Sequence, residues 1–374
     1  MSFLERSAAV YPDRAACIYN GAVTTYGSLH ERVRRHAAAL QSVGVRAGDR
    51  VAYLVPNLPA MLEANFAPMG IGAVLVALNI RLSSREIAYI LNHSGSKVLV
   101  FDSELADTVR QLRGECPGIE TYVQVRDTVP LADDIAGPEY EQWLAAVEPL
   151  AVLPGPASEN DTTTINYTSG TTGMPKGVEY TPRGAYLNAI GEAMEIGLNW
   201  RSVYLWTLPM FHANGWCFPW AVTAVGGTHV CLRRVDPAEV YRLIREESVS
   251  HLCAAPTVLT GLYSAPEAAT ADLTGLTIMT AGAPPAPQVI RTIEGMGAEI
   301  IHVYGLTETY GPCTVAAPQP EWDQMSSEDL ARVKARQGVP YMVYGVGLRV
   351  VDEDMQDVPR DAETMGEVVM RAMP

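Results

Sequence analysis

The chain alternates amphipathic helical patterns with short, nearly continuous apolar runs. Apolar runs of this length suit parallel strands that are covered on both faces. The runs that we expect to form strands lie at residues 51–55, 97–101, 203–208, 228–232, 251–254, 276–280 and 299–303. Because helical patterns separate these runs, the sequence predicts an α/β fold with mainly parallel sheets.

Three helices can be outlined more closely. Ser28 to Glu31 has the pattern of a capping box, followed by apolar positions at helical spacing and a stop at Gly44. A short amphipathic piece lies at 140–147, and a further helix is expected at Ser327–Lys334.

Two stretches interrupt the alternation and suggest boundaries. Residues 126–160 are rich in proline, and residues 316–338 are polar. After Gly338 the pattern changes to short strands at 346–351 and 366–370, separated by acidic turns. We therefore expect two α/β units and the start of a small β unit, at residues 1–160, 161–335 and 336–374.

The composition narrows the functional class. Of the 374 residues 48% are hydrophobic and 18% charged, which is typical of a globular protein. The net charge of −15 argues against a protein that coats nucleic acid, since phosphate binding needs a basic face. No run is apolar enough for a membrane span and the start is charged, so we expect a cytoplasmic protein. Six scattered cysteines predict buried free thiols.

The segment most informative about chemistry is residues 168–177, Thr-Ser-Gly-Thr-Thr-Gly-Met-Pro-Lys-Gly. Its glycines let backbone N–H groups approach a polyanion, its hydroxyls donate further hydrogen bonds, and Lys176 supplies a positive charge. It is not a Walker A loop, because Lys176 is followed by Gly177 rather than Ser or Thr. A flexible linker would need neither a lysine behind a proline nor a β-rich approach. We therefore predict a loop that binds nucleotide phosphates.

Three of the predicted strands end in loops of unusual composition, at 209–216, 281–285 and 304–311. In open α/β sheets ligands bind outside the carboxyl ends of strands, so these loops should meet at one crevice. In the segment 304–308 the ring of Tyr304 can stack on a purine, and the hydroxyl of Thr307 can bond a phosphate. The carboxylate of Glu308 can hold Mg²⁺. A helix N-terminus capped by Thr307 is the alternative for that segment.

The remaining candidates carry weaker signals. Residues 282–284 could lie against a flat base, although a plain turn explains them equally well. His212 follows a strand end and is a candidate functional residue. His229, His251 and His302 lie in or beside strands and are expected in the core. The histidines show no metal-ligand spacing with cysteines or acids.

Together these residues resemble the adenylate-forming superfamily of acyl-CoA synthetases, luciferases and peptide-synthetase adenylation domains. Residues 168–177 look like its phosphate-loop signature, 304–308 like its second signature and 366–371 like the next one. The resemblance covers the whole chain and implies stacked αβαβα subdomains with the beginning of a small β subdomain. The segments most similar to the medium-chain and aryl (benzoate or cinnamate-type) acyl-CoA ligases are 209–219, 251–256 and 336–340.

The resemblance implies roles for matching positions. The phosphates of ATP would contact Thr168, Ser169, Gly170, Thr171, Thr172, Gly173 and Lys176. Adenine would stack on Tyr304, with Gly305 beside it. The segment Gly282, Ala283 and Pro284 would lie on its other side. Thr307 would bond the α-phosphate, and Glu308 together with Thr168 would hold Mg²⁺. The implied catalytic residues are His212, Lys176, Thr307 and Glu308.

The carboxylic acid would lie in a pocket that His212 lines or gates. Its wall is expected to include Trp216, Ala281, Gly282, Gly305, Gly311, Pro312 and Val315. Because several are small and none is charged, an acid with an apolar tail is favoured. The implied reaction is attack of the carboxylate on the α-phosphorus of ATP, giving acyl-AMP and pyrophosphate, with CoA as the acceptor in the full-length enzyme.

The family continues past Arg371 into a ribose motif, a hinge and a small C-terminal domain with the adenylation lysine, whereas this sequence ends at Pro374. We therefore expect an isolated large N-terminal domain that binds ATP or an acyl-adenylate but adenylates poorly. Two alternatives stay open: a ligase-like enzyme that delivers the activated group to an amine, a carrier protein or nitrite, and a non-catalytic nucleotide-binding protein. A homodimer is compatible with the sequence.

Overall fold

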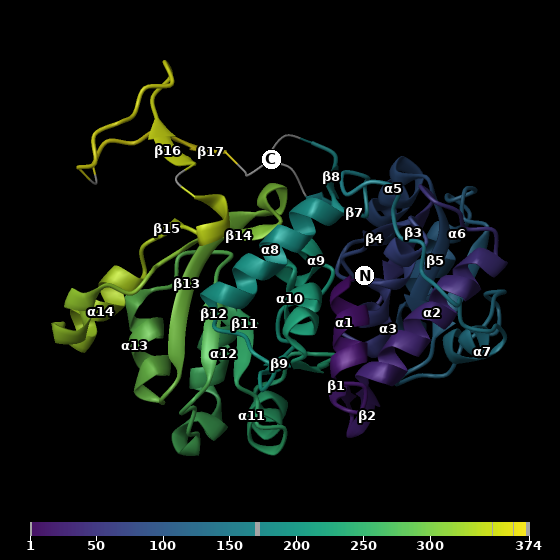
Figure 1. Cartoon of the computed structure of the whole chain (residues 1–374), viewed down its shortest axis with the longest axis horizontal. Helices are drawn as coiled ribbons and strands as arrows, with labels where there is room; N and C mark the ends of the chain where they lie inside the picture. Colours follow the sequence, from purple (N-terminus) through teal and green to yellow (C-terminus); the bar gives the residue numbers. More distant parts are fainter. Residues whose placement is uncertain (1, 169–172, 346, 362, 372–374) are drawn as a thin grey trace.

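Two large sheets and a small terminal hairpin make up the strand structure (Figure 1). The computed structural model describes residues 2–168, 173–345, 347–361 and 363–371. Four of the implied phosphate contacts lie outside the described residues, namely Ser169, Gly170, Thr171 and Thr172.

The first sheet has six strands in the order β6-β5-β3-β4-β7-β8. Neighbouring strands are parallel except for β7 and β8, which form an antiparallel hairpin. The bounds are β3 (Arg50–Leu54), β4 (Val74–Ala77), β5 (Ser96–Asp102), β6 (Thr121–Val125), β7 (Thr164–Thr168) and β8 (Lys176–Tyr180).

The second sheet has nine strands in the order β15-β14-β13-β12-β11-β9-β10-β1-β2. Its central strands are parallel, and the antiparallel pairs lie at its two edges. The bounds are β1 (Ala15–Tyr19), β2 (Ala22–Thr25), β9 (Val203–Leu205), β10 (Thr228–Val230), β11 (His251–Ala254), β12 (Thr277–Thr280), β13 (Glu299–Leu306), β14 (Gly311–Val315) and β15 (Val339–Pro340).

Helices complete five layers, and the predicted αβαβα stack is confirmed. One apolar cluster joins α5 and α6 to the outer face of the first sheet, and another joins α11, α12 and α13 to the outer face of the second. The largest cluster lies between the sheets and holds α1 to α4, α8 and α10. The bounds are α1 (Ser2–Val10), α2 (Tyr26–Ser42), α3 (Pro59–Ala64), α4 (Ala67–Gly70), α5 (Ser84–Ser94), α6 (Ala106–Arg113), α7 (Tyr140–Ala145), α8 (Pro182–Glu195), α9 (Ala213–Trp216), α10 (Phe218–Val225), α11 (Pro237–Glu246), α12 (Pro256–Ser264), α13 (Pro287–Gly295) and α14 (Ser327–Lys334).

The predicted parallel strands are present, and β11 and α14 have the predicted bounds. β9 and β10 are shorter than expected, although Trp206, Leu208 and Leu232 beyond their ends are buried. An apolar run therefore marks burial and not strand pairing alone. All six cysteines are free and buried, as predicted.

The predicted capping box at Ser28 is wrong. Helix α2 begins at Tyr26, and the hydroxyl of Thr25 accepts a hydrogen bond from the Ser28 backbone N at 3.2 Å. Thr25 is the last residue of β2 and keeps an extended backbone, which is the conformation that an N-cap needs. The pattern was ambiguous because both positions carry a hydroxyl.

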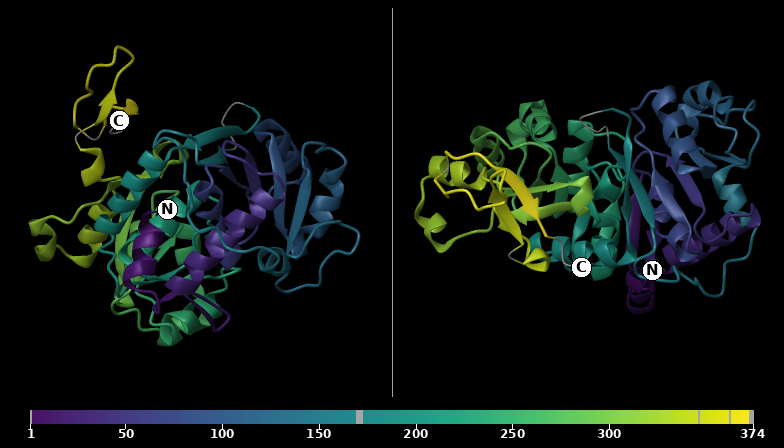
Figure 2. Two further views of the ribbon diagram at one scale, coloured as in Figure 1. Left: turned by 45° about the vertical axis from the view of Figure 1, so that its right-hand side comes forward. Right: turned by 90° about the horizontal axis from the view of Figure 1, so that it is seen from above.

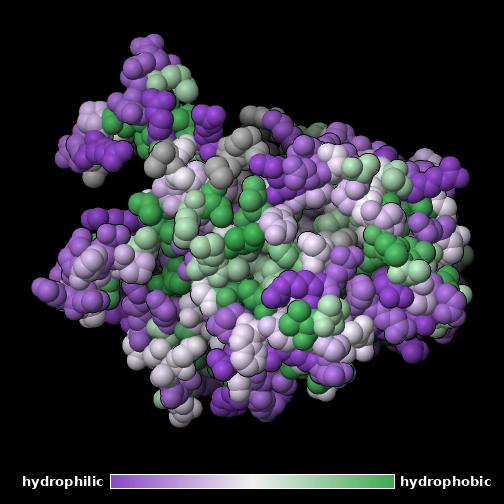
Figure 3. Space-filling view, viewed as in Figure 1, coloured by the Kyte–Doolittle hydropathy of each residue, from purple (hydrophilic) through white to green (hydrophobic). Residues whose placement is uncertain are grey.

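The C-terminal residues form a separate antiparallel hairpin of β16 (Leu348–Val351) and β17 (Glu367–Met370). It projects from the body of the molecule (Figure 2) and is largely hydrophilic (Figure 3). The two large sheets do not follow the predicted ranges, because β1 and β2 join the second sheet while β7 and β8 complete the first.

Candidate active site

The hairpin of β7 and β8 carries the predicted phosphate loop at its tip. Thr168 at the end of β7 pairs with Lys176 at the start of β8. The sequence placed Lys176 in a loop, whereas it is the first residue of a strand. The ladder thus holds the Thr168 hydroxyl and the exposed Lys176 on neighbouring strands, directly at the base of the loop.

Four segments far apart in the sequence line one cleft of about 490 Å³ next to this hairpin. They are the ends of β7 and β8, the turn after β9, the loop after β12 and the segment around the end of β13. The lining residues are Thr168, Lys176, His212, Ala213, Trp216, Ala281, Gly282, Gly305, Leu306, Thr307, Glu308, Gly311 and Pro312. The loops expected to converge at the carboxyl ends of the strands therefore lie together.

Another wall of the cleft is a short 3-10 helix, η3 (Thr307–Thr309), followed by Tyr310 with a left-handed backbone (φ 64°). It is not the N-terminus of a longer helix. Side chains from outside the wall donate hydrogen bonds to its backbone carbonyls: Tyr180 Oη to Thr307 O at 2.7 Å, Tyr344 Oη to Thr309 O at 2.8 Å and Asn188 Nδ2 to Tyr310 O at 3.2 Å. These bonds hold the backbone that carries Thr307 and Glu308.

The third wall is a turn that the sequence analysis did not anticipate. Residues 213–217 all have positive φ, between 47° and 63°, so α9 is a left-handed turn. His212 precedes this turn and Trp216 lies within it, and both line the cleft. The Asn-Gly pair at 214–215 was the available signal, because Asn and Gly tolerate this conformation best.

His212 differs from the core histidines in its surroundings and in its access to the cleft. Its side chain is accessible from the cleft, yet the concave surroundings desolvate it and lower its pKa below the usual value. The imidazole is therefore neutral at pH 7. His229 is fully buried between Trp206 and Thr223, and burial lowers its pKa to about 3. His251 and His302 are also buried and hydrogen-bonded to backbone carbonyls, which confirms the core assignment.

Some predicted site residues do not line this cleft. Ala283 and Pro284 are exposed beside Gly282, and Tyr304 is half-buried in β13. Gly173 is exposed at the edge of the loop. Val315 is buried in β14, where it pairs with Val303 and Val339.

The oxygen atoms at the cleft fit a magnesium ion that arrives with a nucleotide. Across the described ranges, no group of three or more His, Cys, Asp or Glu side chains could hold a metal ion. The cleft offers one carboxylate, that of Glu308, and two hydroxyls, those of Thr168 and Thr307. Mg²⁺ typically binds one or two protein oxygens and takes its other ligands from phosphates and water, so this donor set suits it.

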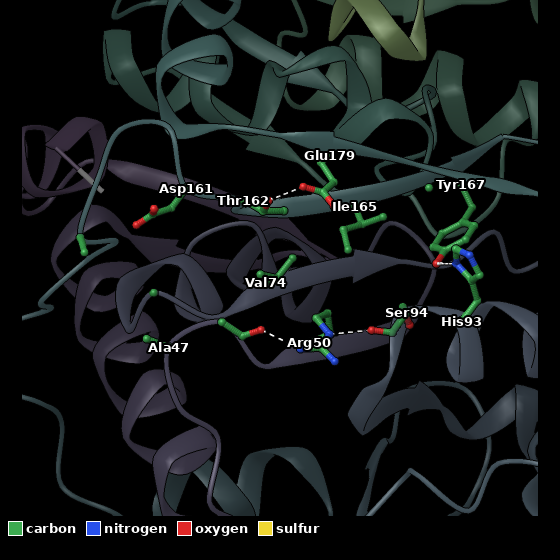
Figure 4. Close-up of a pocket in the computed structure, with 14 residues that line it drawn as sticks. Ala47, Arg50, Val74, His93, Ser94, Asp161, Thr162, Ile165, Tyr167 and Glu179 are labelled. Carbon is green, nitrogen blue, oxygen red and sulfur yellow. Dashed lines mark hydrogen bonds between the residues drawn. The ribbon is translucent and has the colours of Figure 1, made fainter.

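A larger cavity, of about 570 Å³, lies on the other face of the same hairpin (Figure 4). Successive side chains of a strand point to opposite faces, so Ile165, Tyr167 and Glu179 face this cavity, while Asn166 and Tyr180 face inward. Its polar lining is occupied by internal bonds, such as Tyr167 Oη with His93 Nδ1 at 2.8 Å. No predicted site residue is among its lining residues.

The comparisons with known proteins agree with the geometry. The model of the family described as AMP-binding enzyme matches residues 4–373. The chain belongs to this family. It is 40% identical to the peroxisomal acetate/butyrate–CoA ligase AAE7 of Arabidopsis thaliana and 40% identical to 4-hydroxybutyrate–CoA ligase 2 of Metallosphaera sedula. Each alignment covers 99% of this chain and 68% of the relative.

A solved structure has the same fold. The N-terminal domain of FACL13 from Mycobacterium tuberculosis superposes with a TM-score of 0.82 at 27% identity, over 96% of this chain and 86% of that one. The chain is thus an AMP-forming ligase of the acyl-CoA synthetase type, which activates a carboxylic acid through an acyl-adenylate. The relatives' names do not favour a different acceptor or a non-catalytic role. Among the described helices, none is long and apolar enough to cross a membrane.

Proposed function

We propose that the cleft uses ATP and Mg²⁺ to activate a short aliphatic carboxylic acid, which is then transferred to CoA. The observation that carries this proposal is the chemistry of the cleft walls: Lys176 and Thr168 on one side, Glu308 and Thr307 on another, and His212 with Trp216 on the third. A cationic and hydroxyl-bearing wall suits phosphates, and an apolar wall suits the tail of the acid.

The glycines of the cleft wall lie in close contact with their neighbours. A Cβ on Gly305 would lie 1.9 Å from the carbonyl oxygen of Gly311, and a Cβ on Gly311 would lie 3.1 Å from the Cα and Cβ of Trp216. Gly305 and Gly311 are therefore small because backbone and an indole ring pack against them, and their small size does not itself make a pocket for a ring. The choice of a short chain rests on the acetate/butyrate and 4-hydroxybutyrate ligases among the relatives.

The reaction follows from the positions of the groups. A carboxylate oxygen of the acid attacks the α-phosphorus of ATP, and the bond to the bridging oxygen breaks, so that pyrophosphate leaves with the electron pair. Lys176 and the Thr307 hydroxyl are placed to offset charge on the phosphates, and neutral His212 can hydrogen-bond the reacting carboxylate. Glu308 and Thr168 would hold Mg²⁺, which would supply further charge neutralisation.

CoA is proposed as the acceptor because a second cleft of about 490 Å³ adjoins the same turn. It includes Pro209 and Phe211, which lie within three residues of His212, and its lining carries Arg81 and also Arg234, which pairs with Glu104 at 2.9 Å. Guanidinium groups suit the phosphates of a nucleotide thiol. A cytoplasmic location and a homodimer stay predictions.

ATP–pyrophosphate exchange with acetate, butyrate, hexanoate and benzoate tests the adenylation step. We expect slow but measurable exchange with the short acids, because this chain is expected to adenylate poorly, and a loss of at least about 100-fold in Lys176→Ala and Glu308→Ala. Lys97→Ala is the matched control, since Lys97 pairs with Asp49 at 2.9 Å outside the cleft. The proposal is wrong if exchange is absent with every acid, or if Lys97→Ala is as defective as Lys176→Ala.

Trp216→Ala tests the proposed length of the acid. Removing the indole should raise kcat/KM for hexanoate relative to butyrate by about 10-fold or more, because each methylene that finds a pocket is worth about 1–3 kcal/mol. An unchanged preference would place the acid against another wall.

A further inference from the structure

The left-handed turn at 213–217 contains residues that disfavour its conformation. Ala213, Trp216 and Cys217 are neither Gly nor Asn, and all three have positive φ. Left-handed backbone is disfavoured for such residues because Cβ approaches the following carbonyl oxygen. The turn must therefore be held by its surroundings, and strain of this kind is concentrated at functional sites.

Asn214 is the residue that holds it. Its side chain is fully buried, and every polar group of that side chain has a partner. Its Oδ1 accepts from Asn166 Nδ2 at 2.6 Å and from Thr164 Oγ1 at 3.1 Å, and its Nδ2 donates to Asn65 Oδ1 at 3.0 Å. The backbone N of Asn214 donates to Asn166 Oδ1 at 3.2 Å. Asn166 thus grips both the side chain and the backbone of Asn214.

The positions of these two asparagines give the contact a functional meaning. Asn166 lies in β7, two residues before Thr168 at the base of the phosphate loop. Asn214 lies two residues after His212 and two before Trp216, and both of those side chains line the cleft. The amide pair is thus the direct link between the hairpin proposed to bind nucleotide and the wall proposed to hold the acid.

We propose that Asn166 and Asn214 are a pair of positioning residues that couples ATP binding on the β7–β8 hairpin to the placement of His212 and Trp216 against the acid. Neither residue reaches the reacting atoms. Phosphates that bind at Thr168 and Lys176 and shift β7 would move the Asn166 amide, and the turn would follow because Asn214 bonds Asn166 at two points. Since both side chains are uncharged, the coupling does not depend on pH. This inference rests on the proposed function of the cleft.

The test measures how far saturating ATP lowers the KM for butyrate in the exchange reaction. We expect a factor of at least about five in the parent protein, within the range of ordinary allosteric coupling. In Asn166→Ala and Asn214→Gly this factor should fall below about two. The fold-decrease of kcat, measured with both substrates saturating, should be smaller than the fold-decrease of the factor. Glycine at 214 keeps the left-handed backbone without the amide, so Asn214→Ala separates the backbone contribution from the side-chain contribution.

Asn57→Ala is the matched control for loss of a buried amide. Asn57 is buried and bonds the backbone of Trp206, Leu208 and Met210, at the start of the same segment, but none of its recorded partners is in β7. It should reduce stability and leave the coupling factor unchanged. Coupling that persists in Asn166→Ala and Asn214→Gly, or that Asn57→Ala removes equally, would overturn the proposal.

Amide hydrogen exchange keeps this test separate from the test of function. In the ligand-free protein the Gly215 and Cys217 amides donate within the turn, to His212 O at 2.8 Å and Asn214 O at 3.2 Å. Asn166→Ala should speed their exchange by about 10-fold or more, and Asn57→Ala should not. Faster amide exchange would support the link between Asn166 and the turn even if the parent protein showed no pyrophosphate exchange. Unchanged amide protection in Asn166→Ala would contradict that link.

Discussion

Two buried glutamates illustrate different ways of placing a carboxyl group inside this molecule. Glu63 in α3 and Glu192 in α8 are 1% and 0% exposed. Glu63 forms an ion pair with Arg32 at 2.6 Å and accepts a hydrogen bond from Tyr140 Oη at 2.6 Å. Glu192 accepts from Tyr341 Oη at 3.1 Å and from Asn188 Nδ2 at 3.5 Å, and it has no ion-pair partner among the described residues.

Burial raises the pKa of both carboxyl groups, but Arg32 opposes the rise at Glu63 and no cation opposes it at Glu192. The protonated, uncharged form of Glu192 is therefore favoured. Its location gives this a consequence for the active site, since Asn188 bonds both Glu192 and the Tyr310 carbonyl of the cleft wall. A charge pair stabilises the layer between the sheets, and a neutral acid supports the wall that carries Thr307 and Glu308.

The largest expected effect comes from breaking the charge pair. Arg32→Met leaves Glu63 buried without its cation, which should lower the free energy of unfolding by about 3–5 kcal/mol. Arg35→Met in the same helix is the control, because Arg35 pairs with the exposed Glu31 and should cost about 1 kcal/mol. Denaturant unfolding of both variants measures the two losses of free energy. Equal losses would contradict the distinction between the buried pair of Arg32 and the exposed pair of Arg35.

Glu192→Leu should have the next largest effect. It leaves the Tyr341 hydroxyl and one Asn188 N–H without an acceptor, and such losses cost about 1–3 kcal/mol. Pyrophosphate exchange should fall as well, since Asn188 is then free to turn away from Tyr310. Glu192→Gln keeps acceptor and donor positions and should preserve both stability and exchange at pH 7. Failure of Gln to substitute would mean that the carboxyl is ionised.

The pH dependence of stability sharpens the same point. Because the folded pKa of Glu192 is raised, its contribution to stability is fully present below the unfolded pKa of about 4.3 and is lost as the pH rises towards the folded pKa. Relative to Glu192→Gln, the parent should lose up to about 1.4 kcal/mol per pH unit in that window. Unfolding free energies of both proteins at pH 5, 6, 7 and 8 test this slope. Parallel curves would contradict a raised pKa.

Much of the fold and cleft could be predicted from local patterns. Apolar runs identify the parallel strands, and the rule that ligands bind at the carboxyl ends of strands correctly predicts that distant loops meet at one crevice. These signals are short-range, so each can be recognised in a segment of about ten residues.

The features that escaped prediction depend on long-range partners. Residue Glu192 looks like any polar position on a helix until Tyr341 packs over it, and the left-handed turn at 213–217 is held by Asn166 and Asn65, which bond Asn214. Likewise, β1 joins the second sheet because it pairs with β10, more than 200 residues later in the chain. Such partners are set by the tertiary fold, so no local pattern in the sequence identifies them.

The smallest expected effect comes from Glu195, the half-buried neighbour of Glu192 one turn along α8. One of its carboxylate oxygens accepts a hydrogen bond from the Met342 backbone N at 3.2 Å. Burial raises the pKa of Glu195, and this hydrogen bond partly opposes the rise. Glu195→Gln keeps that hydrogen bond, so the free energy of unfolding should change by less than about 0.5 kcal/mol at pH 7. Because Glu195 and Glu192 share a helix and a packed segment, a loss as large as that of Glu192→Leu would show that this segment, and not the neutral acid, supports the cleft wall.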